Sequence, residues 1–393
     1  MNKHLLEPEV QKFISDNLNI DITSLILKAP VFSAVTNSEL AQQIQSKLKS
    51  SKKLPTWFST PQIYFPNKLN VEQTSSELAA KYKSELIKGE SIIDLSGGLG
   101  VDSFYFSKTF KQVIHCELDK DLSEIANHNF NCLGMSNIEN YAGDGISYLE
   151  SIGETVDWIY IDPARRHDVK GKVYHLSDCQ PNVLDHLELL FSKSNNILIK
   201  TSPMLDISKA IEELQNIKEI HIVSLKNEVK ELLFMIDRNY EDEPLTKCIE
   251  LVMDDVGSFS FYMEDEKNTT SSIGAIQSFL YEPSAGILKS GGFKIIGDHF
   301  KVNKLHRHTH LYSSNEKISF PGRIFKILET IPFNNKQAKK ALTRRQANIS
   351  SRNFPLTTAQ IRKRYKIKDG GSTYIFFTTD MNDQRVILIC EKA

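Results

Sequence analysis

The sequence predicts an α/β protein with a parallel sheet, and three observations lead to this class. The apolar run Ser91–Asp94 leads directly into the glycine-rich turn 97–100. A second apolar run ends at Glu117, one strand–helix–strand step further along the chain. Two later apolar runs are followed by Asp144 and Asp162. Open α/β sheets bind ligands at the carboxyl ends of their strands, so these glycines and acids should gather at one edge.

The first two strand ends have the chemistry of a nucleoside-binding site. Gly97, Gly98 and Gly100 allow positive φ angles and close approach of a ligand to the backbone. Glu117 suits a ribose because a carboxylate accepts hydrogen bonds from both vicinal hydroxyls. An NAD-dependent enzyme shares these features, but its Gly-x-Gly-x-x-Gly order differs from the Asp-x-x-Gly-Gly-x-Gly found here. A plain strand-to-helix turn is the other interpretation of the glycines alone.

With its four strand ends in this order, the segment 70–240 resembles the class I S-adenosylmethionine-dependent methyltransferases. The resemblance implies a Rossmann-like, seven-stranded methyltransferase sheet, with S-adenosylmethionine as cofactor. Asp94 and the glycine loop would pass under the methionine part of the cofactor. Glu117 would hold the ribose hydroxyls, and Asp144 would meet the adenine amino group. Asp162 would face the substrate.

Thr74 and Ser75, just before the first strand, have two interpretations. Either residue can cap the helix that the pattern continues over 77–86. The resembling class closes over the cofactor carboxylate at this place in the chain. Both residues are therefore candidate cofactor contacts.

The fourth strand ends in Asp162-Pro163-Ala164-Arg165, which we take as the candidate catalytic motif. Amino methyltransferases of the resembling class carry Asp or Asn, two prolines and an aromatic residue. Here the acid and the first proline, Pro163, are kept, whereas the second proline and the aromatic residue are not. Arg165 can stack on a base or pair with phosphate or carboxylate. A salt bridge to an acid at the sheet edge is the alternative.

The expected target atom is a nitrogen. The Asp-Pro-x-Arg ending also resembles RNA uridine C5-methyltransferases, which need a cysteine nucleophile at a later strand end. The fifth expected strand ends in Lys200-Thr-Ser-Pro203, without a cysteine. Methyl transfer is an in-line displacement that needs a well-placed nucleophile more than a dedicated acid or base.

The chain divides by pattern into four segments. Residues 1–70 are expected to form an N-terminal helical region and 71–244 the methyltransferase domain, closed by a hairpin over 218–225 and 231–237. Residues 245–316 are expected to form an α+β linker or ferredoxin-like subdomain, and 317–393 a basic α+β module. Within the third segment the pattern predicts an antiparallel pair, 248–254 with 258–263, and a helix over 274–280. The last segment is expected to contain strands over 322–327, 347–351, 373–378 and 385–391, and helices over 336–342 and 357–364.

The end of the chain resembles the small THUMP-like domain fused to a group of bacterial class I methyltransferases. The residues that carry this resemblance are Asn348–Thr357, Ile361–Tyr365 and Gly370–Thr378, with Glu72–Glu77 and Phe279–Pro283 earlier in the chain. THUMP domains bind RNA, usually tRNA. The resemblance therefore implies a tRNA or rRNA substrate.

Charge is unevenly distributed, although the formal net charge of the whole chain is −1. Residues 317–368 contain 14 Lys and Arg and one acid, Glu329, so this stretch carries +13 and the remainder −14. Such asymmetry favours a polyanionic partner, and a solvated helix face is the alternative. The candidate RNA contacts are Arg344, Arg345, Arg352, Arg362, Lys363 and Arg364. A methyltransferase of a small molecule or protein, or a non-catalytic RNA-binding protein that retains the cofactor fold, stays an alternative.

Other features of the sequence set limits. The five cysteines are scattered without a Cys-x-x-Cys pair, which argues against a zinc site and a disulfide framework. If the segment His306-Arg-His-Thr-His310 is a strand, its three imidazoles lie on one face and could bind zinc or nickel. A surface strand face or contacts with phosphate are the favoured interpretations, so no metal is expected. No run of 18 apolar residues predicts a membrane span, and an N-terminus without an apolar signal core predicts a cytoplasmic protein. The pattern does not predict an oligomeric state.

Overall fold

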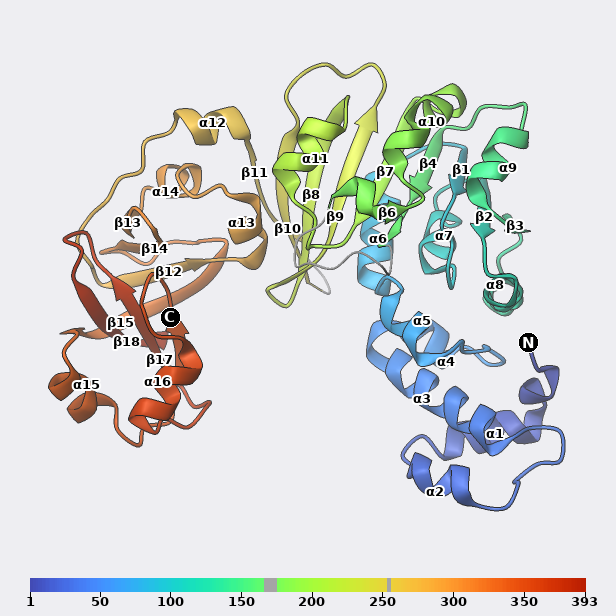
Figure 1. Ribbon diagram of the computed structural model, residues 1–393, viewed down its shortest axis with the longest axis horizontal. Coiled ribbons are helices and arrows are strands. Elements are labelled where there is room, and N and C mark those ends of the chain that lie inside the picture. Colours follow the sequence, from blue (N-terminus) through green and yellow to red (C-terminus); the bar gives the residue numbers. More distant parts are fainter. Residues whose placement is uncertain (166–174, 253–255) are drawn as a thin grey trace. The chain divides into compact units, whose positions relative to one another are not determined.

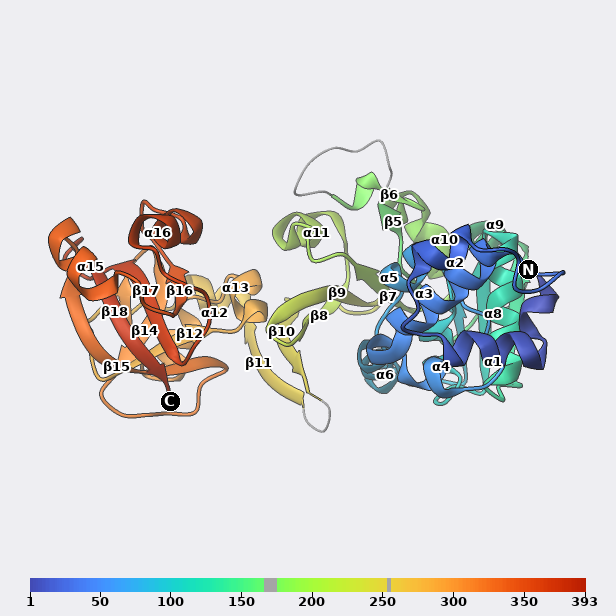
Figure 2. The same cartoon turned by 90° about the horizontal axis from the view of Figure 1, so that it is seen from below.

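The computed structural model describes residues 1–165, 175–252 and 256–393 (Figures 1 and 2). The chain forms two compact units. Unit 1 comprises Met1–Lys218 and Leu233–Asp242, and unit 2 comprises Glu219–Leu232 and Glu243–Ala393. The division runs through the hairpin of β8 (Ile217–Leu225) and β9 (Glu228–Asp237). These two adjacent strands confirm the closing hairpin expected from the sequence.

Unit 1 is built on a parallel sheet whose strands lie in the order β3-β2-β1-β4-β7. These strands are β1 (Ser91–Asp94), β2 (Gln112–Glu117), β3 (Ile138–Ala142), β4 (Trp158–Ile161) and β7 (Asn196–Thr201). The strand order reverses between β1 and β4, which is the topological switch point where such sheets bind ligands. Ile92 and Ile93 in β1 are fully buried, as expected for a central strand covered on both faces.

Six helices accompany this sheet in the described part of the domain. They are α6 (Glu77–Leu86), α7 (Val101–Phe106), α8 (Lys120–Cys132), α9 (Gly145–Ser151), α10 (Leu187–Lys193) and α11 (Ile207–Glu213). A short ladder of β5 (Ala164–Arg165) with β6 (Cys179–Gln180) and two 3-10 turns, η2 (Leu176–Asp178) and η3 (Val183–His186), lie between β4 and α10. No helix within the described ranges is long and apolar enough to cross a membrane.

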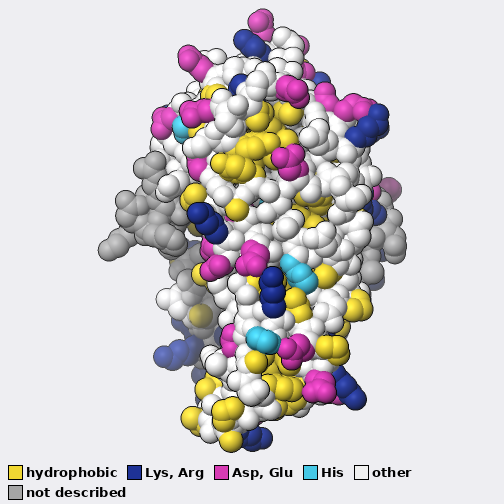
Figure 3. All heavy atoms as spheres, turned by 90° about the vertical axis from the view of Figure 1, so that its right-hand side faces the viewer, with side chains coloured by type: hydrophobic (Ala, Val, Ile, Leu, Met, Phe, Trp, Pro, Cys, Tyr) yellow, Lys and Arg dark blue, Asp and Glu magenta, His cyan; other side chains and the backbone are white. Residues whose placement is uncertain are grey.

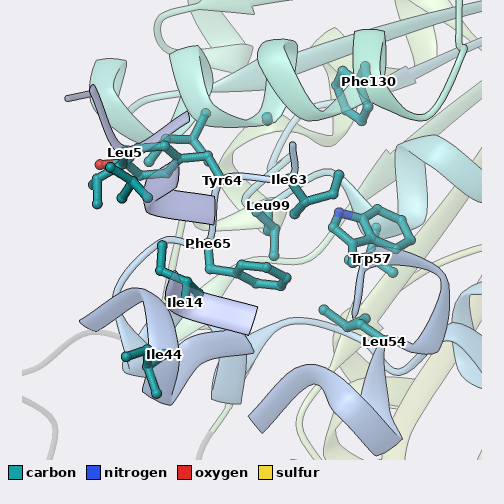
Figure 4. Packing of buried hydrophobic residues seen from close by; sticks show 14 of the residues in the cluster. Leu5, Ile14, Ile44, Leu54, Trp57, Ile63, Tyr64, Phe65, Leu99 and Phe130 are labelled. Atoms are coloured by element: carbon teal, nitrogen blue, oxygen red, sulfur yellow. The ribbon is translucent and has the colours of Figure 1, made fainter. Parts of the chain in front are cut away.

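The N-terminal helical region shares its core with the methyltransferase domain (Figure 4). Its elements are η1 (Lys3–Leu6), α1 (Pro8–Asp16), α2 (Ile22–Leu27), α3 (Asn37–Lys53), α4 (Pro55–Ser59) and α5 (Lys68–Gln73). Leu5, Ile14 and Trp57 belong to the same buried cluster as Leu99 of the glycine loop and Phe130 of α8. The N-terminal helices therefore pack directly against the elements that surround the first strand end.

Two buried side-chain amides hold the connector between α4 and α5, residues 60–67. Gln43 donates to the carbonyl of Phe65 at 2.6 Å and accepts from its N–H at 3.0 Å. Asn129 of α8 makes the same pair of contacts with Tyr64, at 3.0 and 2.9 Å. The connector has no backbone partner strand, and these side chains satisfy backbone groups that would otherwise be costly to bury.

A buried ion pair joins α6 to α7. Lys83 is fully buried, and its Nζ lies 3.1 Å from Oδ1 of Asp102. Asp102 Oδ2 also accepts from Ser75 Oγ at 2.8 Å and from Tyr160 Oη of β4 at 2.9 Å. Burial by itself would raise the pKa of Asp102, but the ammonium groups of Lys83 and Lys200 outweigh it and hold the pKa below its ordinary value.

Unit 2 extends the fold beyond the seven expected strands. β10 (Leu245–Leu251) pairs parallel with β8, and β11 (Val256–Tyr262) pairs antiparallel with β10. The expected antiparallel pair is thus confirmed over the described residues, whereas 253–255 lie outside them. The parallel pairing of β10 with β8 was not predicted, because a strand's partner depends on contacts distant in sequence.

The second sheet of unit 2 has the order β13-β14-β12-β15-β18-β17-β16. Its strands are β12 (Phe279–Pro283), β13 (Asn303–His306), β14 (Thr309–Ser314), β15 (Gly322–Pro332), β16 (Asn348–Ser351), β17 (Thr373–Thr379) and β18 (Arg385–Lys392). Its helices are α12 (Met263–Asn268), α13 (Ala285–Ser290), α14 (Ile295–His299), α15 (Asn335–Leu342) and α16 (Thr358–Tyr365). The last two helices share one buried core with β15–β18 and cover the same face (Figure 2).

The six elements expected over 322–391 are all confirmed. The helix expected over 274–280 is wrong, because its apolar end belongs to β12, which pairs with β14 on one side and β15 on the other. Short apolar runs fit a buried strand and a helix equally well by periodicity. Only pairing with two neighbours distinguishes the two structures here.

The buried ion pair predicts a large effect on stability. Lys83→Met leaves Asp102 charged and buried without its ammonium partner, so we expect unit 1 to lose about 3–5 kcal/mol of unfolding free energy. Lys81→Met, on the exposed face of the same helix, should change it by less than about 0.5 kcal/mol. The only two tryptophans, Trp57 and Trp158, are buried in unit 1, so fluorescence during urea unfolding reports this unit. Equal effects of the two substitutions would contradict the role assigned to Lys83.

Candidate functional site

A cavity of about 1050 Å³ lies at the carboxyl ends of the parallel strands. Residues after four successive strands line one part of it: Leu95, Ser96, Glu117, Leu118, Asp144, Gly145, Ile146, Asp162 and Ala164. A second part comes from the segment after β6: Gln180, Pro181, Asn182, Asp185 and His186. The sequence-based prediction that acids from different strands gather at one sheet edge is met by Glu117, Asp144 and Asp162.

Glu117 is held by the glycine loop. Its Oε2 accepts from the N–H of Gly98 at 2.7 Å, and its Oε1 accepts from the N–H of Asp119 at 2.8 Å. Gly98 has a φ of +58°, a conformation that favours glycine. Two backbone donors therefore fix the carboxylate at the cavity wall, and its contact with a ribose stays a prediction.

The other two glycines of the loop are required by packing. A Cβ on Gly97 would lie 2.0 Å from Cε1 of the His115 ring, and a Cβ on Gly100 would lie 2.2 Å from Cζ of Phe130. A Cβ on Gly98 would meet nothing closer than the Ser96 carbonyl at 4.0 Å. The loop thus lies tightly on β2 and α8 through two glycines, and only Gly98 leaves open space beside it.

Asp94 braces this loop and does not line the cavity. It is buried, and its carboxylate accepts from Ser103 Oγ at 2.6 Å and from the N–H of Ser96 at 3.1 Å. Burial raises the pKa of Asp94 to about 7, although the hydrogen bond from Ser103 opposes the rise. His115, on the other side of Ser103, has its pKa lowered by burial to about 3 and is therefore neutral. Contact of Asp94 with a cofactor stays a prediction.

Asp144 lines the cavity as the N-cap of α9. Its Oδ2 accepts from the N–H of Ser147 at 2.8 Å and from Ser147 Oγ at 2.7 Å. The next residue, Gly145, was missed by sequence reasoning, yet a Cβ there would lie 2.5 Å from the carbonyl oxygen of Leu95. Gly145 lets the start of α9 approach the end of β1, which places Asp144 beside the glycine loop.

The structure places Thr74 and Ser75 away from the cavity wall. Thr74 ends α5, where its N–H donates to the carbonyl of Asn70 at 3.1 Å. Ser75 donates to Asp102 and accepts from Lys83 at 2.9 Å. The helix expected over 77–86 is confirmed as α6, but the expected cap is wrong, because the N-cap is Ser76 and not Thr74 or Ser75. Direct contact of either residue with a cofactor stays a prediction.

Asp162 lies in the cavity wall and is ion-paired with Lys200 of β7. Its N–H donates to Ser96 Oγ at 2.6 Å, which links the fourth strand end to the glycine loop. Lys200 was not predicted as a site residue; its signal was a charged residue after the buried run Ile197–Ile199. Pro163 is buried behind the wall. The backbone of Arg165 pairs with Cys179 in the β5–β6 ladder.

The basic residues of unit 2 differ in the contacts they make. Arg323 and Arg352 both pair with Glu282, which is 3 % exposed in its side chain, and Arg352 lies 2.9 Å from it. Arg362 pairs with Asp369 at 2.6 Å, and Arg364 donates to Asn335 at 2.7 Å. Three of the six predicted RNA contacts are therefore engaged within unit 2. Lys363 is exposed on α16.

Two turns bring four exposed cations together. The N–H of Arg344 donates to the carbonyl of Tyr365 at 3.3 Å, and the N–H of Lys368 donates to the carbonyl of Arg345 at 2.9 Å. The segments around Arg344 and Lys366 therefore lie side by side. We call Arg344, Arg345, Lys366 and Lys368 the cationic strip; all four are exposed. On the face shown in Figure 3, by comparison, Lys and Arg side chains are scattered singly.

The three histidines do not share one strand face, because residues 307 and 308 form the turn between β13 and β14. His306 donates through Nε2 to Asp383 at 2.8 Å, while its Nδ1 accepts from Asn353 at 3.0 Å. His310 stacks on Phe293 with ring centroids 3.6 Å apart, and burial lowers its pKa to about 4. Within the described ranges no cluster of three His, Cys, Asp or Glu side chains is suited to hold a metal ion. All five cysteines are free thiols.

Comparisons with known proteins found two domain families in the C-terminal part of the chain and one similar structure that covers the whole chain. A model of the THUMP domain-like family matches residues 322–392, and a model of a ferredoxin-like domain matches 279–321. The crystal structure of a "putative methyltransferase from Porphyromonas gingivalis W83" is 32% identical, with a TM-score of 0.89 over 100% of this chain and 98% of that chain. The fold is thus that of a class I methyltransferase. More specifically, the chain belongs to the bacterial class I S-adenosylmethionine-dependent methyltransferase family with a C-terminal THUMP-like domain.

Other similarities are partial. The structure of TrmK from M. capricolum in complex with S-adenosyl-homocysteine is 17% identical, with a TM-score of 0.33 over 42% of this chain and 70% of that chain. An rRNA methylase from Streptococcus thermophilus is 14% identical, with a TM-score of 0.30 over 41% of this chain and 93% of that chain. TM-scores this low do not establish a shared fold over the whole chain. No curated protein matches this sequence.

The buried carboxyl of Asp94 predicts a pH dependence. Its pKa of about 7 exceeds the ordinary value of 3.8, so the folded state binds the proton more tightly than the unfolded state. Stability from this group is therefore fully present below about pH 4 and is lost as the pH rises to about 7. The slope is at most about 1.4 kcal/mol per pH unit. Asp94→Asn should remove this contribution, whereas Glu150→Gln on the exposed face of α9 should keep it. Urea unfolding of each protein at several pH values measures the slopes, and identical slopes would count against the buried-carboxyl explanation.

Proposed function

We propose that this protein transfers a methyl group from S-adenosylmethionine to a nitrogen of an RNA base, in tRNA or rRNA. The observation that carries the proposal is the cavity at the switch point, where Glu117, Asp144 and Asp162 from three successive strand ends line one wall. Its place in the sheet and its carboxylates match what the family requires of a nucleoside cofactor site.

The residues present fit that cofactor. Glu117, fixed by the N–H groups of Gly98 and Asp119, is suited to the ribose hydroxyls. Asp144 is suited to the adenine amino group, and the open space beside Gly98 to the methionine part. When bound, the cofactor supplies an electrophilic methyl group on a sulfonium cation. An acidic wall is a favourable environment for a cation.

A nitrogen target is supported by the composition of the cavity wall. No cysteine is among the described lining residues, so the nucleophile that carbon methylation of uridine requires is lacking there. Cys116 at the end of β2 is buried, and burial raises the pKa of its thiol far above the ordinary value. Asp162, ion-paired with Lys200, is suited to accept a hydrogen bond from an N–H of the base and so orient its nitrogen.

RNA as the substrate is supported by the cationic strip and by the THUMP-like domain. Four exposed cations on two adjacent turns form a surface that phosphates can approach. Methylation of a small molecule or protein stays an alternative, but it gives the cationic strip no role. RNA binding without catalysis also stays an alternative, and the cofactor experiment below together with an assay of methyl transfer to RNA distinguishes it from the proposal. We also propose that the protein acts in the cytoplasm.

The first experiment tests the cofactor. S-adenosyl-homocysteine should raise the melting temperature, with a stabilisation of about 2.7 kcal/mol at roughly 100 times its Kd. Glu117→Ala should remove most of this shift, because the ribose loses its acceptor. Glu150→Ala, outside the cavity on α9, should leave the shift unchanged. Stabilisation by NADH and not by S-adenosyl-homocysteine would refute the assignment.

The second experiment tests RNA. Arg344, Arg345, Lys366 and Lys368 changed together to Glu should weaken binding of bulk tRNA and lower the log–log salt slope by about 3, because fewer counterions are released. A control with the same charge change replaces Lys12, Lys81, Lys88 and Lys120 in unit 1, which are exposed. Filter binding over a salt series measures both quantities. If the strip variant and the control bind alike, the strip is not the RNA site.

A further inference from the structure

The wall of the cavity contributed by Gln180 of β6 and the segment after it contains none of the residues that we assign to the cofactor. We propose that Gln180, Asn182, Asp185 and His186 form the subsite for the acceptor base. This subsite takes an amino-bearing nucleobase by its hydrogen-bonding edge and excludes phosphate. The inference rests on the proposed function, since it names the substrate group that would meet the cofactor.

The size of the cavity supports a second ligand. At about 1050 Å³ it reaches the upper limit of pockets that enclose one drug-sized molecule, which span roughly 300–1,000 Å³. The residues suited to the cofactor line only the part formed by the strand ends. The part lined by Gln180–Asn182, Asp185 and His186 is left for a different group.

The β5–β6 ladder places this wall next to the catalytic motif. Ala164 pairs directly with Gln180, so the second wall begins two residues from Asp162 along the chain and one strand across. The turn η3 then carries Asp185 and His186 into the lining of the same cavity. A ligand on this wall would therefore lie beside Asp162, where its nitrogen must be for methyl transfer.

The side chains of the wall match the edge of an amino-bearing base. Asn182 Oδ1 accepts from the N–H of Leu184 at 3.3 Å, which turns its amide group into a fixed donor. Asp185 and Asp162 are acceptors, and Gln180 and His186 can donate or accept. Adenine, guanine and cytosine each present an exocyclic amino group beside ring acceptors, whereas uracil presents a single N–H between two carbonyls. Two carboxylates therefore favour an amino-bearing base.

The charge of the lining excludes phosphate. Four of the described lining residues are acids, namely Glu117, Asp144, Asp162 and Asp185, and none of the described lining residues is Lys or Arg. The ion pair with Lys200 offsets the charge of Asp162, but the other three carboxylates still repel a phosphate, because the effective dielectric of a cavity is below that of water. The base should thus enter the cavity while its phosphates stay outside, as in an unpaired or flipped-out nucleotide.

The experiment measures binding of free nucleosides to the complex with S-adenosyl-homocysteine. Calorimetry gives the Kd of S-adenosyl-homocysteine, and saturation-transfer NMR compares adenosine, guanosine, cytidine and uridine with their 5′-monophosphates. We expect an amino-bearing nucleoside to bind more tightly than uridine and more tightly than its own monophosphate. Asp185→Asn and, separately, Asn182→Ala with His186→Phe should raise its Kd about tenfold or more, with the Kd of S-adenosyl-homocysteine unchanged. Glu188→Gln, on the exposed face of α10, is the matched control.

Three results would overturn the subsite: no nucleoside binds, a monophosphate or uridine binds best, or the variants bind nucleosides like the parent. Failure of the parent to bind S-adenosyl-homocysteine would instead refute the proposed function. The conservative Asp185→Asn variant changes one exposed side chain and keeps its size, so loss of folding cannot be mistaken for loss of the subsite. The two failures are read from separate measurements on the same protein.

Discussion

The buried carboxylate of Asp102 is the contact on which the geometry of the methyltransferase unit depends. It joins Lys83 of α6, Ser75 of the preceding loop and Tyr160 of β4 to the first turn of α7. Since α7 begins directly after Gly100, this contact fixes where the glycine loop ends relative to the sheet. Below the loop, Asp94 holds Ser96 and Ser103 in the same way. The cavity is therefore shaped from behind by polar groups that a ligand need not touch.

The cavity has two walls of different origin. Strand ends of the parallel sheet form the wall suited to the cofactor, and their positions follow from the sheet itself. Described residues between β4 and α10 form the other wall, and among them the short β5–β6 ladder and the turns η2 and η3 define the backbone. Loops of this kind change function without changing the scaffold. The acceptor specificity of this protein should accordingly reside in Gln180, Asn182, Asp185 and His186.

Several arginines of unit 2 are ion-paired with carboxylates, so the number of basic residues alone does not show which cations are exposed. The carboxylate of Glu282 takes up both Arg323 and Arg352, and Asp369 takes up Arg362. The cationic strip remains exposed because two turns hydrogen-bond to each other through their backbones and project their side chains outward. The RNA contact that we propose uses these exposed side chains and not the total of +13 that the segment carries.

The sequence by itself determined the parallel sheet, the closing hairpin and the six elements of the last 72 residues, because these depend on local periodicity and on glycine and acid positions at strand ends. It also predicted that Glu117, Asp144 and Asp162 lie together, since every strand end in such a sheet faces the same edge, and all three line one cavity. Tertiary structure decided the contacts between residues that lie far apart in the sequence. Lys200 meets Asp162, Gln180 pairs with Ala164, and Arg352 turns to Glu282, each across 16 to 70 residues of chain. It also placed Asp94 and Ser75 behind the cavity wall. The burial of a polar side chain depends on the elements packed over it, and the local sequence around the side chain does not specify those elements.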